Sequence, residues 1–205
     1  MQGEGGRGAQ LWLYGDVGCP WSYLALARIR KLAVESRIVV GWRPLPRFTR
    51  SQSRGDPAVS SPRGAVPPSP EAVEFETLGL PFQGPPPDFD SRDALLALEF
   101  ARDLGRPTLD RSLDGLFAAN FTWKANLGDR EELLDVCQDL GLDRAALGSA
   151  LDDGRYEAEL DLAEAEAERY GIEQIPTILA GRLKIIGAAP DEVLATVVRK
   201  SLGTD

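Results

Sequence analysis

Residues 11–25 read LWLYGDVGCPWSYLA, and this stretch decides the fold class. The apolar run at its start stops at Gly15, which is typical of a short buried strand. Pro20 suits the first position of a helix, because the N–H that proline lacks would have no helical partner there. The helical pattern then continues to about Ser36. We therefore predict a strand, a tight loop and a long helix, in that order.

A second strand and a later hairpin extend this beginning. Residues 38–42 read IVVGW, which is rich in β-branched residues and is bounded by Pro44. A strand, a helix and a second strand within about 35 residues predict a right-handed parallel βαβ unit. Near the end of the chain, residues 172–180 and 183–186 are predicted to pair across the short turn between them. Pro190 then opens a last helix.

The middle of the chain divides into two parts of different character. Residues 44–90 hold 11 of the 15 prolines, which predicts a long loop or lid. Residues 91–155 carry four amphipathic helical patterns, and Ser91 is the expected N-cap of the first. This layout resembles an α/β fold with a thioredoxin-like core and a central all-helical insertion. The predicted parts are a flexible N-terminal tail (residues 1–10), the core (11–43 and 156–205), the Pro-rich loop or lid (44–90) and the helical insertion (91–155).

The composition excludes several kinds of site and partner. The chain has no histidine, which removes Ser-His-Asp and Cys-His pairs and His-ligated zinc. Two cysteines are too few for a thiolate metal site, so we expect no metal. A net charge of −9 argues against a nucleic-acid partner, and no apolar run approaches the roughly 20 residues that span a membrane. We expect a cytoplasmic location.

Cys19 is the candidate nucleophile. It directly precedes Pro20, so it stands at the N-cap with the backbone N–H groups of Trp21 and Ser22 near its sulfur. Those donors and the helix dipole favour a thiolate, so we expect a lowered pKa. The Ser22 hydroxyl can also donate to the sulfur. The alternative for Cys19 is simple core packing, which is the preferred interpretation for Cys137 on the apolar stripe of a helix.

These motifs together resemble the DsbA-like superfamily, which includes FrnE-type oxidoreductases, kappa-class glutathione transferases and 2-hydroxychromene-2-carboxylate isomerases. Residues 19–21 match the C-P-W-C-Y motif of the FrnE type, and residues 22–25 resemble the S-Y-L-A of the glutathione-dependent branch. Residues 42–44 resemble the W-R-P at the end of the family's second strand. Residues 170–177 resemble its cis-proline loop.

The resemblance implies roles for six residues. The implied catalytic residues are Cys19 and Ser22, and the implied substrate-binding residues are Pro20, Trp21, Ile175 and Pro176. It also implies that the Ile175–Pro176 bond is cis and packs against Cys19. Ser22 stands where the FrnE type has a second cysteine, so the site is a monothiol. A mixed disulfide on Cys19 would then need an outside thiol for its release.

The function that these observations favour is thiol-disulfide exchange through Cys19. No tightly bound cofactor is expected, and glutathione or another small thiol would be the co-substrate. The partner would be a small-molecule thiol or the disulfide of a peptide or protein. Two alternatives remain open: a glutathione-dependent transferase or isomerase, and a non-catalytic binding protein of the same fold. The sequence also leaves a homodimer open.

Overall fold

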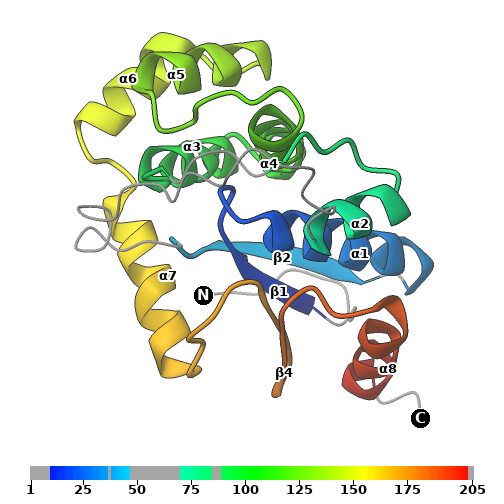
Figure 1. The fold of residues 1–205 in the computed structure, drawn as a ribbon. Helices are drawn as coiled ribbons and strands as arrows, with labels where there is room; N and C mark the ends of the chain where they lie inside the picture. Colours follow the sequence, from blue (N-terminus) through cyan, green and yellow to red (C-terminus); the bar gives the residue numbers. More distant parts are fainter. Residues whose placement is uncertain (1–9, 37, 47–69, 85–88, 203–205) are drawn as a thin grey trace.

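The computed structural model describes residues 10–36, 38–46, 70–84 and 89–202. Within these residues it forms one four-stranded sheet and eight helices (Figure 1). The elements are β1 (Gln10–Gly15), α1 (Pro20–Ser36), β2 (Val39–Pro44), α2 (Pro70–Thr77), α3 (Arg92–Asp103), α4 (Arg106–Phe121), α5 (Arg130–Asp139), α6 (Arg144–Asp152), α7 (Glu157–Arg169), β3 (Thr177–Ala180), β4 (Leu183–Ile186) and α8 (Asp191–Leu202). No helix in the described part of the chain is long and apolar enough to cross a membrane.

The strands lie in the order β2-β1-β3-β4. β1 is parallel to β2, so the predicted βαβ unit is present. β1 also pairs with β3 in antiparallel register, with Tyr14 opposite Thr177. β3 and β4 form the predicted hairpin, in which Ala180 lies opposite Leu183. β1 is therefore a central strand, and its carboxyl end lies beside the beginning of β3.

The two faces of the sheet pack against different helices, as the alternation of side chains along a strand requires. Leu11 and Leu13 of β1 point into the main core, which contains buried residues of α1, α8 and the helical insertion. Tyr14 points to the other face, where it packs with Ala167 of α7 and Leu179 of β3. The sheet is thus covered on both faces, and the fold is the predicted α/β class.

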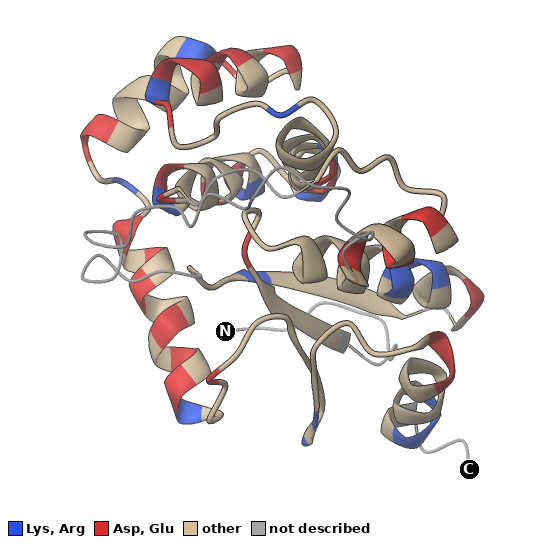
Figure 2. Ribbon diagram, viewed as in Figure 1, with Lys and Arg blue, Asp and Glu red and all other residues tan. Residues whose placement is uncertain are grey.

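The helical insertion, α3 to α6, lies over the carboxyl end of β1 (Figure 1). Its later helices begin at side-chain caps: the Asp129 carboxylate accepts two N–H groups in the first turn of α5, and the Asp143 carboxylate accepts the N–H of Ala146 in α6. Arg92 at the start of α3 pairs with Glu157 and Glu164 of α7, whose many acidic residues are visible in Figure 2. These ion pairs join the insertion to the helix that follows it.

The prediction of a loop or lid over residues 44–90 is wrong at two places. Pro44 belongs to β2, and residues 70–77 form α2. Phe75 of α2 is fully buried, with its ring centroid 4.2 Å from that of Phe82. Burial of this ring stabilises a helix whose start signal, Pro70, is masked in the sequence by the many prolines around it.

Parts of three predicted segments lie outside the described residues. They are residues 1–9 of the tail, residues 47–69 and 85–88 of the loop or lid, and residues 37 and 203–205 of the core. Gln10, placed in the tail, is the first residue of β1.

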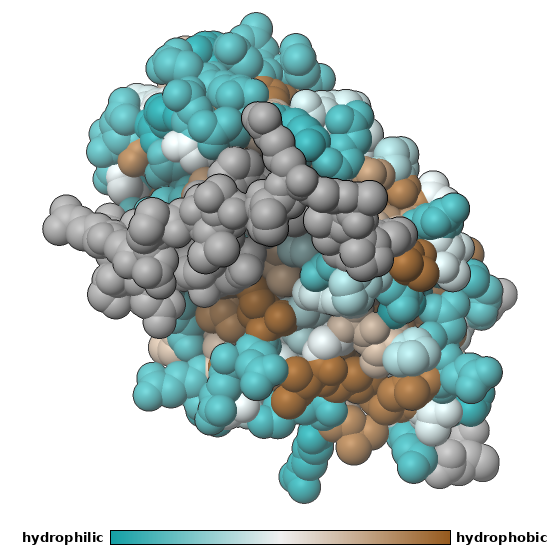
Figure 3. Space-filling model, in the orientation of Figure 1, coloured by the Kyte–Doolittle hydropathy of each residue, from teal (hydrophilic) through white to brown (hydrophobic). Residues whose placement is uncertain are grey.

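The two edges of the sheet differ. Along the outer edge of β2, Arg106 donates to the Val40 carbonyl at 2.6 Å and Arg102 donates to the Trp42 carbonyl at 3.0 Å. Arginines from the insertion therefore bind two backbone carbonyls of this edge strand. At the other edge, the Ile186 side chain of β4 is 62% exposed. Figure 3 shows apolar surface in this part of the molecule, around β4 and the segment that leads to α8.

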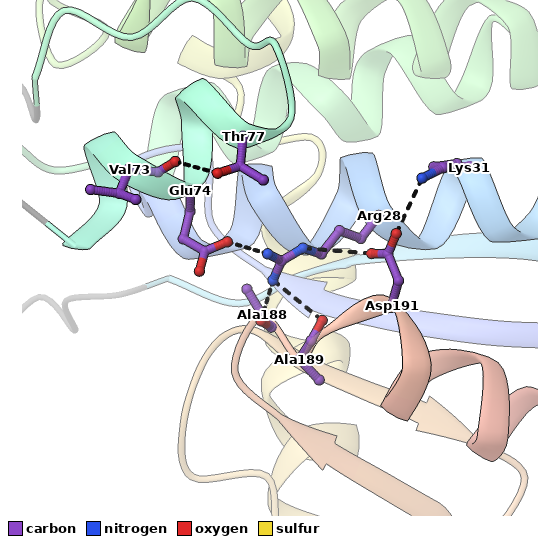
Figure 4. A network of polar contacts seen from close by, with 8 residues as sticks. All are labelled: Arg28, Lys31, Val73, Glu74, Thr77, Ala188, Ala189 and Asp191. Atoms are coloured by element: carbon purple, nitrogen blue, oxygen red, sulfur yellow. Dashed lines mark hydrogen bonds and ion pairs between the residues drawn. The ribbon is translucent and has the colours of Figure 1, made fainter.

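A buried arginine on α1 joins three segments that are distant in sequence (Figure 4). Arg28 is only 8% exposed. It donates to the carbonyls of Ala188 and Ala189, at 2.6 and 3.3 Å, in the segment between β4 and α8. It also forms an ion pair with Glu74 of α2, and its Nε lies 3.8 Å from Asp191 of α8. One guanidinium thus satisfies two backbone carbonyls and two carboxylates.

We expect Arg28→Met to lower the free energy of unfolding by about 2–3 kcal/mol, since it leaves these carbonyls and carboxylates without their buried donor. Urea unfolding followed by circular dichroism measures this loss. Lys31→Met is the matched control, because Lys31 is exposed and its ion pair within the described part of the chain is with Asp191 at 3.2 Å. Its expected effect is below about 1 kcal/mol. Equal losses in the two variants would contradict the role assigned to Arg28.

Candidate active site

The loop between β1 and α1 places Cys19 at the start of the helix, as predicted. The Cys19 N–H donates to the Asp16 carbonyl at 3.0 Å, which closes the loop. The Cys19 carbonyl accepts from the N–H groups of Ser22 and Tyr23, at 3.0 and 3.3 Å. Since the carbonyl of an N-cap residue accepts the first bonds of a helix, Cys19 has the N-cap position.

The donors expected around the Cys19 sulfur are present, but the predicted direction of its pKa shift is wrong. The thiol is only 5% exposed. Burial raises the pKa of Cys19, and the negative charge of Asp16 raises it further. Hydrogen bonds from the Ser22 hydroxyl and from the N–H groups of Ser22 and Trp21 lower the pKa of the thiol by a smaller amount. The net shift is upward because burial acts more strongly on a thiolate than these donors do.

Ser22 is held so that its hydroxyl can donate to the sulfur. The side chain is fully buried, and its oxygen accepts the N–H of Asp16 at 3.3 Å. Gly15 makes this close packing possible. A Cβ at Gly15 would lie 2.8 Å from the Ser22 hydroxyl oxygen and 3.0 Å from the Trp42 ring, which is too close for either contact. The absence of a side chain at Gly15 therefore keeps Ser22 beside the thiol.

The four residues predicted to bind substrate differ in exposure. Pro20 and Pro176 are buried, whereas Trp21 and Ile175 are half-buried. The Ile175–Pro176 bond is cis, as the resemblance implied. The pairing of Tyr14 with Thr177 brings Pro176 and the loop after β1 to the same end of the sheet. Contact of these residues with a substrate stays a prediction.

Asp16 is a residue of this site for which the sequence alone predicts no role. Its carboxylate is fully buried. One oxygen accepts the N–H of Gly18 at 2.7 Å, and the other accepts the hydroxyl of Ser91 at 2.7 Å. Ser91 has the predicted N-cap position of α3, but its side chain makes no cap hydrogen bond to that helix. The signal in the sequence is an acidic residue directly after an apolar strand.

Cys137 differs from Cys19 in its surroundings. It is fully buried on α5, and burial raises its pKa to about 12. A thiol in this state reacts slowly, so the core role predicted for Cys137 agrees with the structure. Within the described residues, no three Cys, Asp or Glu side chains gather in the way that a metal ion would require.

The fold and the motifs define the class of the protein. The chain belongs to the DSBA-like thioredoxin domain family, whose model matches residues 10–199. Among solved structures, it is similar to a probable DsbA oxidoreductase from Streptomyces coelicolor, with a TM-score of 0.77 and 21% identity over 96% of this chain and 91% of that one. It is also similar to a 2-hydroxychromene-2-carboxylate isomerase, with a TM-score of 0.70 and 19% identity over 96% of this chain and 99% of that one.

A third similar structure is a cytosolic disulfide reductase, DsbM, from Pseudomonas aeruginosa, determined with GSH. Its TM-score is 0.65, with 18% identity over 95% of this chain and 98% of that one. At these identities the three likenesses show a shared fold. Proteins with this fold thus include a probable oxidoreductase, an isomerase and a disulfide reductase.

We expect the rate of alkylation of Cys19 by iodoacetamide to rise with pH around a midpoint above about 8.5, the value for a free cysteine. Ser22→Ala should move the midpoint higher still, because it removes the hydroxyl that lowers the pKa of the thiol. The measurement is the alkylation rate by mass spectrometry at a series of pH values. Cys19→Ser is the control that shows which thiol reacts. A midpoint below 8.5 in the parent protein would contradict this account.

Proposed function

We propose that the protein is a thiol-disulfide oxidoreductase with a monothiol site, in which Cys19 exchanges disulfides. Ser22 donates a hydrogen bond to the sulfur, and Pro20, Trp21, Ile175 and Pro176 form the surface that receives the substrate. Glutathione or another small thiol is the co-substrate, and the working location is the cytoplasm. The other partner is the disulfide of a peptide or a protein.

One observation carries this proposal: the donors of the first helical turn converge on Cys19. The Ser22 hydroxyl and the N–H groups of Ser22 and Trp21 lie close enough to its sulfur to lower the pKa of the thiol. Three donors are more than a core cysteine needs, since a buried thiol packs as a small apolar group. They stabilise the negative charge that the sulfur carries when it attacks a disulfide or leaves one.

The exchange itself needs no further oxidant or reductant. The Cys19 thiolate attacks one sulfur of oxidised glutathione, and the disulfide bond of glutathione breaks. A new disulfide joins Cys19 to one glutathione, and the other leaves as a thiolate that takes up the proton from Cys19. An outside thiol, the co-substrate, then attacks the mixed disulfide and restores Cys19. Cys137 is buried in the core, so it cannot serve as the second thiol.

The comparisons support this class of reaction. Two of the similar structures are described as a probable DsbA oxidoreductase and a disulfide reductase, and the second was determined with GSH. The likeness to an isomerase, together with the S-Y-L-A at residues 22–25, favours a second candidate. That candidate is a glutathione-dependent transferase or isomerase that acts on an aromatic electrophile.

The first test of the proposal is covalent capture of glutathione. After incubation with oxidised glutathione, we expect the intact mass to increase by one glutathionyl group, and reduced glutathione should remove it. Cys19→Ser should gain nothing, whereas the control Cys137→Ala should behave as the parent does. A parent protein that stays unmodified would show that this exchange does not occur. Conjugation of 1-chloro-2,4-dinitrobenzene to glutathione without capture would favour the second candidate.

The second test restores a dithiol. Ser22→Cys places two thiols three residues apart in the first turn of α1, where the Ser22 hydroxyl already forms a hydrogen bond to the sulfur of Cys19. We expect this variant to reduce insulin disulfides in the presence of dithiothreitol at least about tenfold faster than the parent, because the second thiol can release the mixed disulfide within the same molecule. Turbidity of the insulin B chain measures the rate. Equal rates would mean that the missing cysteine does not limit the site.

A further inference from the structure

The loop that carries Cys19 is held at three points by the helical insertion and by the residues just before α3. The Ser91 hydroxyl donates to the Asp16 carboxylate at 2.7 Å. Asn120 of α4, which is fully buried, donates from its amide to the Val17 carbonyl at 2.9 Å. A Cβ at Gly18 would lie 3.4 Å from the Phe89 ring, so this ring covers the loop closely. Asp16 and Val17 are therefore bonded directly to this region, and Gly18 lies beside it.

Asp16 links these contacts to the sulfur. Its backbone carbonyl accepts the Cys19 N–H at 3.0 Å, and its backbone N–H donates to the Ser22 oxygen at 3.3 Å. Its side chain bends back to the Gly18 N–H at 2.7 Å. The backbone of Cys19 and the side chain of Ser22 are thus both bonded to Asp16.

The carboxylate also acts as a charge. Asp16 is fully buried beside a thiol that is itself 5% exposed, and few water molecules can screen one from the other. Among the described residues that shift the pKa of Cys19, Asp16 contributes a charge, and this charge acts against the thiolate. The other groups around the sulfur, from Ser22 and Trp21, are neutral donors.

We propose that Asp16 is a positioning residue for Cys19, through which the helical insertion controls how readily the thiol gives up its proton. Its hydrogen bonds fix the loop, and its charge keeps Cys19 protonated until a substrate is present. The proposal deepens the proposed function and rests on Cys19 as the reacting group. It also adds a partner within the chain, because Ser91 holds the charge in place from 75 residues away in sequence.

This arrangement has a consequence for exchange. A thiolate that is costly to form is also a poor leaving group, and a mixed disulfide on Cys19 carries no charge beside Asp16. The glutathionylated site is therefore favoured over the thiolate, and it is released slowly. Because the site has one thiol, the adduct stays on Cys19 until an outside thiol releases it.

Asp16→Asn separates the charge from the hydrogen bonds. The amide oxygen can still accept from Gly18, and the amide N–H can donate to the Ser91 oxygen, so the loop keeps its shape. Two readouts are needed: the pH midpoint of iodoacetamide alkylation at Cys19, and the rate at which reduced glutathione releases the adduct. Asp139→Asn is the matched control, since it removes the same charge from an exposed position at the end of α5. Circular dichroism shows whether each variant is folded.

We expect the Asp16→Asn midpoint to fall by roughly 0.5–1 pH unit, with faster release of the adduct, and the Asp139→Asn midpoint to stay as in the parent. Ser91→Ala keeps the charge and removes one donor, so its midpoint should be at or above that of the parent. If Asp16→Asn does not fold, Asp16→Ser also removes the charge at position 16, and its midpoint should fall in the same way.

Two results would overturn the proposal. One is an unchanged or higher midpoint in a folded, neutral variant at position 16. The other is a lower midpoint in Ser91→Ala, which would mean that a loosened loop, and not the charge, governs the thiol. A parent protein that alkylates at Cys19 but takes up no glutathione would contradict the proposed function and leave the outcome for Asp16 readable from alkylation alone.

Discussion

A carboxylate buried inside a protein has to be hydrogen-bonded, because an ion without partners there costs several kcal/mol. Asp16 meets this requirement with donors from two directions, the Gly18 N–H of its own loop and the Ser91 hydroxyl of the insertion. The first bond bends the chain after β1 so that Cys19 has the N-cap position of α1. The second bond attaches the insertion to that bend. The position of the thiol, the entry into α1 and the docking of the insertion all depend on this one group.

The parts of the fold that local rules specify could be predicted from the sequence. Pro20 marks the start of α1, and its predicted bounds agree with those of the structure. The hairpin of β3 and β4 follows from two short apolar runs around Gly181, which has a positive φ of 60°. α2 could not be predicted, because the helix depends on the burial of Phe75 and because the prolines around the helix indicate a loop. Local signals were sufficient where the helix or turn is stabilised by residues near it in sequence.

The candidate site shows the same division. The N-cap position of Cys19 and the donors of the first turn follow from the order Cys-Pro-Trp-Ser, and the structure has both. The pKa of the thiol was expected to fall, and burial, which depends on the whole fold, raises it. Ser91 was expected to cap α3 because its neighbours in sequence form a helix. Its hydroxyl donates to Asp16 instead, and the sequence around these two residues does not predict that contact.

The order of the strands also determines when the sheet can form. β1 lies at the centre of the sheet, yet its antiparallel neighbour β3 begins more than 160 residues later, with Tyr14 opposite Thr177. On a ribosome, β1 and β2 leave the exit tunnel long before β3 is made, whereas α3 to α6 contact one another and follow in one stretch. We expect the helices of the insertion to fold early from local contacts, since such contacts need little loop closure. β1 can pair with β3 only near the end of synthesis. The site around Cys19 is therefore incomplete until β3 has been made.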